Sequence, residues 1–203
     1  MRVLAIDTSS KSCSVALFDG ARVIEARHEM IGRGHAERLV PMIAELPEKG
    51  RADAVHVALG PGSFTGVRIG LAAARALGLA WRARVRGFGS LHLLAVMAPQ
   101  GHDEAVTICV DGGHGEWFVQ DFAPDASATG EAASLTPTEA AQRGAQSLII
   151  GNRAEDLAKL VGGSARAIDT LPDARFASQL PYSALTDNLV PVYGRAPDAR
   201  KPA

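Results

Sequence analysis

A pattern of strands followed by alternating helices and strands occurs twice in this chain of 203 residues, and the repetition constrains its fold more than any other feature. In the first half, apolar alternation and an Asp-Gly turn predict three successive strands, followed by helices and a buried strand. Pro, Gly and polar residues at 99–103 end that pattern, and it starts again at residue 105. We therefore expect an α/β protein with two lobes, residues 1–100 and 101–203, each a mixed sheet flanked by helices.

The strands expected in the first half share short apolar or alternating sequences, at 3–7, 14–18, 22–29 and 55–59. The helices expected there are 34–46, bent or delayed by Pro41, 67–81 and 90–97. The second half predicts strands at 105–110, 117–122, 148–150 and 167–168, with helices at 138–143 and 154–161. Residues 124–137 show little periodicity, and the proline-rich segment 189–197 predicts an extended tail.

Composition excludes several classes of protein. A net charge of -1, from 21 basic and 22 acidic residues, gives no overall field to hold a polyanion, so a stand-alone nucleic-acid binder is disfavoured. Asp7 interrupts the first apolar run before a signal-peptide core could form, and the apolar segment 67–81 is too short and too charged to span a membrane. Cys13 and Cys109 have no CxxC spacing and predict buried thiols. We expect a soluble protein of a reducing compartment.

Asp7, Thr8 and Ser9 follow the first predicted strand and precede a strand pair that turns at Asp19-Gly20. One hypothesis is that this strand end binds the phosphates of a nucleotide through backbone amides, with Asp7 holding a hydrated magnesium ion. The alternative is that the hydroxyls cap a turn and that Asp7 accepts backbone amides. The residues alone favour the turn.

The glycine-rich segment 60–66, Gly-Pro-Gly-Ser-Phe-Thr-Gly, joins a predicted buried strand to a helix. It matches neither GxxxxGK[ST] nor GxGxxG, because no lysine follows Gly66 and Thr65 occupies the third glycine position. The following helix is rich in Ala and Gly and would let a second helix approach closely. Burial within its own lobe is the other interpretation. Arg68, Arg75 and Arg82 recur every seven residues and form one stripe, which is either solvated or faces acidic groups of a partner or an RNA backbone.

No catalytic constellation is recognisable in the sequence. The six histidines contain no His-x-x-x-His pair, which is the spacing of a helical metal clamp. No GxSxG motif occurs, and neither Cys13 nor Cys109 has a sequence signature of an activated nucleophile.

Four segments together resemble the TsaB (YeaZ) family: LAIDTS at 4–9, HAERLVPMI at 35–43, LGPGSFTGVRIG at 59–70 and PVYGRAPDA at 191–199. The third is the most specific. The resemblance implies a two-lobed actin-like, ribonuclease-H-like ATPase fold. It also implies a non-catalytic, cytosolic subunit of the machinery that makes threonylcarbamoyladenosine in transfer RNA.

The resemblance further implies the partners. The chain would pair with the related catalytic subunit TsaD, help to form a site for the ATPase TsaE, meet transfer RNA only through the complex, and form a homodimer when alone. It would need no cofactor itself, because ATP or ADP and metal would belong to partner subunits. The catalytic relative carries a metal-binding His-x-x-x-His, whereas the matching positions here are Ser90 and Leu94. His92 offers one ligand at most.

The first lobe is then the expected assembly surface. The residues predicted to contact the partner are Leu39, Met42, Ile43, Leu46, Arg68, Ala74 and Arg75. A small phosphotransferase or ATPase that acts through Asp7, Thr8 and Ser9 is the alternative function, and a metallopeptidase is excluded because the ligand set is missing. Two departures from the family pattern are Asp111-Gly112-Gly113, where an arginine is usual, and Gly194 in the tail.

Overall fold

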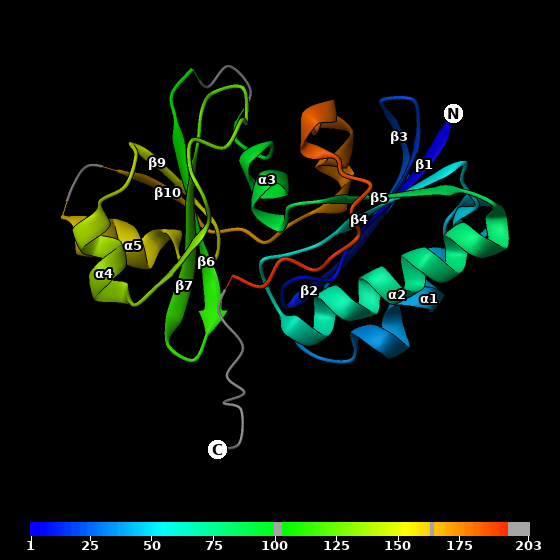
Figure 1. Ribbon diagram of the computed structural model, residues 1–203, viewed down its shortest axis with the longest axis horizontal. Helices are drawn as coiled ribbons and strands as arrows, with labels where there is room; N and C mark the ends of the chain where they lie inside the picture. The colour runs from blue at the N-terminus through cyan, green and yellow to red at the C-terminus, as the bar shows by residue number, and fades with distance from the viewer. Residues whose placement is uncertain (100–102, 163–164, 195–203) are drawn as a thin grey trace.

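Two five-stranded mixed sheets form the framework of the protein in a computed structural model that describes residues 1–99, 103–162 and 165–194 (Figure 1). The strand order is β3-β2-β1-β4-β5 in the first sheet and β10-β9-β6-β7-β8 in the second. In each sheet an antiparallel pair stands beside parallel strands, since β1 pairs antiparallel with β2 and parallel with β4. The α/β class and the mixed sheets flanked by helices are confirmed.

The first sheet comprises β1 (Arg2–Asp7), β2 (Ser12–Asp19), β3 (Arg22–Met30), β4 (Ala54–Ala58) and β5 (Arg84–Phe88). Its helical elements are α1 (His35–Ala44), η1 (Pro47–Gly50), α2 (Phe64–Trp81) and α3 (Ser90–Ala95). The second sheet comprises β6 (Val106–Gly113), β7 (Glu116–Phe122), β8 (Ala133–Leu135), β9 (Leu148–Ile150) and β10 (Arg166–Ile168). The remaining elements are α4 (Pro137–Arg143), α5 (Ala154–Val161), η2 (Ala174–Gln179) and η3 (Tyr182–Ala184).

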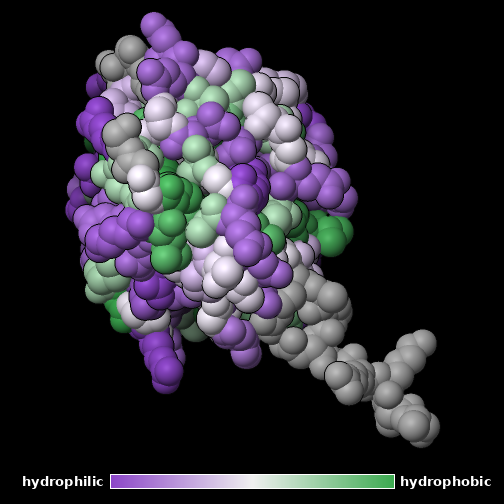
Figure 2. Space-filling view, turned by 90° about the vertical axis from the view of Figure 1, so that its left-hand side faces the viewer, coloured by the Kyte–Doolittle hydropathy of each residue, from purple (hydrophilic) through white to green (hydrophobic). Residues whose placement is uncertain are grey.

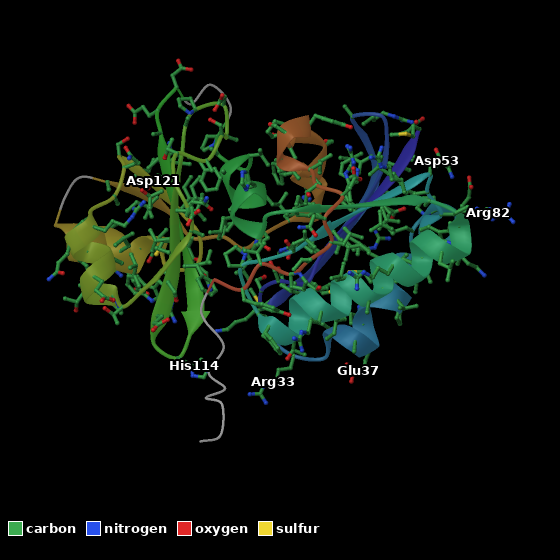
Figure 3. The ribbon with its side chains drawn as sticks, in the orientation of Figure 1. Arg33, Glu37, Asp53, Arg82, His114 and Asp121 are labelled. Atoms are coloured by element: carbon green, nitrogen blue, oxygen red, sulfur yellow. The ribbon has the colours of Figure 1, made fainter. Side chains whose placement is uncertain are left out.

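Three elements need comment against the sequence prediction. Strand β5 was not predicted, because Arg84 and Arg86 break its apolar pattern at the edge of the sheet. Strand β8 lies within residues 124–137, where the sequence left a loop and a poorly specified strand as alternatives. Helix α1 continues through Pro41, because the proline ring and the backbone of Glu37 are both on the exposed side of the helix (Glu37 is labelled in Figure 3). The Glu37 carbonyl loses its hydrogen bond to residue 41, but water can solvate it there.

Helices cover both faces of the first sheet. Helices α1 and α2 pack on one face through an apolar core of residues from β1, β2, β4 and both helices. The other face packs against η2 and α3, and the contribution of η2 means that the chain returns to the first sheet after completing the second. Helix α3 lies between the two sheets, with Leu93 in the core of the first and Leu91 and Leu94 in the core of the second.

The second sheet is covered on its outer face by α4 and α5. Helix α4 begins with a complete capping box, in which Thr136 and Glu139 satisfy each other's backbone amides. Figure 2 looks onto this side of the molecule and shows hydrophilic residues around small apolar areas. Among the described residues, no helix is both long and apolar enough to cross a membrane.

Candidate functional site

A cavity of about 810 Å³ lies between the two sheets. One wall is formed by the chain after β1, the start of α2 and α3, and the opposite wall by the hairpin between β6 and β7. The lining residues include Ser9, Ser10, Lys11, Gly62, Ser63, Phe64, Arg68, Ser90, Asp111, His114, Phe118, Asn152, Tyr193 and Gly194. Both polar and apolar side chains therefore face this space.

The turn 7–9 is buried beside the cavity. The Asp7 carboxylate is 0% exposed, and its Oδ1 accepts hydrogen bonds from the Ser9 amide and hydroxyl, both at 2.8 Å. The Thr8 hydroxyl donates to the Gly66 carbonyl at 2.7 Å, and of the three residues only Ser9 lines the cavity. These contacts match the interpretation in which Asp7 and the hydroxyls stabilise a turn.

The electrostatics of Asp7 follow from its burial. Loss of solvation and, to a smaller extent, the nearby Asp173 raise the pKa of this carboxyl and outweigh the hydrogen bonds from Ser9, which lower it, so that the pKa is about 6. Asp7 Oδ2 has no hydrogen-bond partner. A group that is costly to ionise and enclosed by protein does not fit the role of holding a hydrated magnesium ion, so the geometry does not support the predicted phosphate site.

The glycine-rich segment explains why the turn 7–9 is enclosed. A side chain at Gly62 would overlap the Ser9 backbone, one at Gly66 would overlap the Thr8 carbonyl, and one at Gly70 would overlap the Thr8 hydroxyl. The first turns of α2 therefore lie directly on the turn 7–9. Two sequence motifs that are more than fifty residues apart form one packed unit, with Ser63 capping the helix by accepting from the Gly66 amide.

The apolar part of the predicted partner interface is wrong for the folded chain. Its five residues have between 0% and 2% of their surface exposed and form the core beneath α1 and α2; they are Leu39, Met42, Ile43, Leu46 and Ala74. The small residues of α2 thus allow the helix to approach its own sheet, which is the alternative that the sequence left open. These side chains are not available to a partner.

Arg68 and Arg75 are exposed, and both contact the C-terminal segment. The Arg68 guanidinium lies 3.7 Å from the centre of the Phe64 ring and donates to the Tyr193 hydroxyl at 3.0 Å. Arg75 donates to the Leu189 carbonyl at 2.8 Å. The sequence gives no signal for the contact between Arg68 and Tyr193, although Tyr193 lies in the segment PVYG that resembles the family.

The remaining predicted positions are in or near the cavity. Ser90 lines it, and its buried hydroxyl has no hydrogen-bond partner. His92 packs edge-on against Phe122, and burial lowers the pKa of its imidazole. No group of three or more His, Cys, Asp or Glu side chains that could hold a metal ion occurs within residues 1–99, 103–162 and 165–194.

The segment Asp111-Gly112-Gly113, which departs from the family pattern, forms the end of the hairpin of β6 and β7. Asp111 Oδ1 accepts from the Gly113 amide at 2.9 Å, and the Asp111 amide donates to Asn152 Oδ1 at 3.0 Å. Arg153, at the start of α5, lies 3.4 Å from the same carboxylate. An arginine thus faces Asp111 from another element, which the local sequence around residue 111 could not show.

Two lobes of mixed sheet, joined by a central helix around a cleft, define a protein of the actin-like fold class. The family model for TsaD, described as tRNA N6-adenosine threonylcarbamoyltransferase, matches residues 25–185. The chain belongs to this family, and its similarities place it with the TsaB (YeaZ) members.

The similarities to individual proteins support this placement. The TsaB protein of Escherichia coli, named for threonylcarbamoyladenosine biosynthesis in tRNA, is 35% identical over 131 residues, which are 62% of this chain and 56% of that protein. The Haemophilus influenzae TsaB protein is 36% identical over 55% of this chain and 49% of its own length. The chain spans about half the length of the curated relatives it matches. The solved structure of YeaZ from Pseudomonas aeruginosa is 27% identical with a TM-score of 0.78, over 95% of this chain and 100% of that one.

Proposed function

We propose that this chain is a non-catalytic subunit in the biosynthesis of threonylcarbamoyladenosine in transfer RNA. The names of its relatives support the pathway. The observation that carries the proposal is that the chain belongs to a family named for the transferase, while α3 carries Ser90 and Leu94 where the resemblance implies the two histidine ligands of the transferase. Neither side chain replaces an imidazole. The chain itself then needs no metal or nucleotide, and its role is to support the catalytic subunit TsaD.

The partner surface that we propose is the outward side of α1 and α2. Val40 is 58% exposed and Leu79 is 85% exposed, and on the same outward faces lie the exposed small residues Ala44, Ala72 and Ala76. The two helices pack side by side on the sheet. An apolar surface of small residues lets helices of a partner approach closely. TsaD would occupy this surface, a second copy would occupy it when TsaD is absent, and TsaE would bind at the junction.

This surface makes a specific prediction. Leu79→Arg should weaken the affinity for TsaD by at least ~tenfold, because it places a charge within the proposed buried area, at the most exposed leucine of α2. The matched control is Leu160→Arg, since Leu160 is also an exposed leucine on a helix but belongs to α5 on the second sheet. Sedimentation of each variant mixed with TsaD measures the affinity. Equal binding by both variants would place the interface elsewhere.

The activity is tested by reconstitution. With TsaD, TsaE, ATP and the threonylcarbamoyl adenylate precursor, formation of modified adenosine in transfer RNA should require this chain. The chain alone should neither modify transfer RNA nor retain one equivalent of zinc or iron after chelation. Modification without TsaD would contradict the proposal, and sustained ATP hydrolysis by the isolated chain would support the alternative of a small actin-fold ATPase.

A further inference from the structure

The cavity between the two sheets combines a buried apolar floor with an open mouth. Its floor is formed by buried side chains of two elements, Leu91 and Leu94 of α3 and Phe118 of β7. At its mouth, the rings of Phe64 and Tyr193 have centres 5.1 Å apart and are 54% and 44% exposed. A volume of about 810 Å³ is in the range of cavities that bind small organic molecules. Three aromatic rings on this space favour a ligand with an aromatic body.

The charged groups that line the cavity leave an excess of positive charge. Lys11 and Arg68 are exposed, and neither side chain has a carboxylate partner among the described residues. Among the described lining residues the only acid is Asp111, whose carboxylate already pairs with Arg153 and accepts from the Gly113 amide. These charges favour an anionic ligand.

Uncharged hydrogen-bond donors lie on the same wall as the two cations. Helix α2 has 18 residues, and Ser63 and Phe64 at its start line the cavity. The amides of Phe64 and Thr65 have no acceptor within the described part of the chain, and the helix dipole adds positive potential at this end. Ser90 of α3 also lines the cavity, is 1% exposed, and its hydroxyl has no hydrogen-bond partner. A buried hydroxyl without a partner is costly, and a ligand oxygen would supply the partner.

The surroundings favour a ligand with a single negative charge. The turn 7–9, where phosphates were expected, is covered by the first turns of α2. Residues 1–99, 103–162 and 165–194 contain no group of side chains that could hold a metal ion to neutralise several phosphate charges. A carboxylate needs only one or two cations and a few donors, which this wall offers.

We propose that the cavity binds a small aryl carboxylate. The carboxylate lies at the start of α2, where Lys11 and Arg68 neutralise it, and the aromatic body packs on Leu91, Leu94 and Phe118. The site is independent of the partner role proposed above, because it uses residues of the cleft and not the outward sides of α1 and α2.

Calorimetric titration with 4-phenylbutyrate tests the site, and 4-phenylbutan-1-ol is the neutral analogue. One molecule of the carboxylate should bind per chain with a dissociation constant below ~1 mM, as expected for a ligand of this size. The alcohol should bind about tenfold more weakly, because it lacks the charge-assisted hydrogen bonds. Equal affinity of the two compounds, or displacement of the carboxylate by a lower concentration of ADP, would overturn the proposal.

The cations are tested by the double variant Lys11→Gln and Arg68→Gln. It should weaken carboxylate binding about tenfold and change alcohol binding less than ~twofold, because only the charged ligand loses its partners. The matched control is Arg22→Gln, which removes an exposed arginine of β3 that does not line the cavity, and it should change neither affinity. Equal loss of both ligands in the double variant would show that the two side chains only support the cavity, and would overturn the proposal.

The position of the ligand is tested by filling the cavity. Val110 lines it from the second sheet, and Val110→Trp should abolish binding of both compounds. Circular dichroism shows whether this variant folds, and if it does not, Ser10→Trp on the opposite wall replaces it. Undiminished binding in a folded, filled variant would place the ligand outside the cavity and overturn the proposal.

Discussion

At the scale of single residues, Asp7 illustrates how burial converts a carboxylate into a destabilising group. Its folded pKa of about 6 is above the unfolded value near 3.8, so the folded state binds the proton more tightly between these pH values. The stability gained from the protonated form is complete below about pH 3.8 and is lost as pH rises through 6. We therefore predict that the free energy of unfolding of Asp7→Asn increases by roughly 3 kcal/mol relative to that of the parent protein as the pH is raised from 4 to 7.

The measurement is urea unfolding of both proteins at several pH values. The difference between the two proteins isolates Asp7, because other carboxylates such as Asp187, whose pKa is lowered by Arg84 and Arg86, are present in both. Asn can still accept from Ser9 through its side-chain oxygen. A difference in stability that does not change with pH would show that Asp7 titrates normally.

At the scale of elements, the contact of α2 with the turn 7–9 depends on glycine. Alanine is usually better than glycine in a helix, by about 1 kcal/mol. Gly66→Ala should nevertheless destabilise the protein by about 2 kcal/mol, because its Cβ would overlap the Thr8 carbonyl and displace α2 from β1. The control is Gly130→Ala, where no atom lies within 4 Å of the added Cβ. Thermal unfolding of both variants measures the effect, and equal midpoints would show that α2 can move without cost.

At the scale of the whole molecule, the two sheets should unfold together. Helix α3 has Leu93 in one core and Leu91 and Leu94 in the other, and η2 returns to the first sheet. Trp81 and Trp117 report on the first and second sheet respectively. We predict that Trp81→Phe and Trp117→Phe, each leaving one fluorophore, show coincident urea transitions by fluorescence and circular dichroism. In either variant, a fluorescence transition separated from the circular dichroism transition would mean that the sheets unfold independently.

The sequence by itself determined the order of most strands and helices, the α/β class and the family, because these follow from local periodicity and from short motifs. It also favoured the turn at 7–9 over a phosphate site. It missed β5, since Arg84 and Arg86 interrupt the apolar pattern of that edge strand. Local propensity cannot show that such arginines are held by a carboxylate from a distant segment.

Only the tertiary structure decided which surfaces are free. Periodicity identified the apolar side of α1, but the same stripe suits a protein core or a partner, and the structure places Leu39 and Met42 in the core. The pairing of Arg68 with Tyr193 joins residues 125 positions apart, and that of Thr8 with Gly66 joins residues 58 apart. Such contacts depend on how the sheets and helices pack. Folding brings together residues that are far apart in the sequence, and the local pattern around one of them does not predict the other.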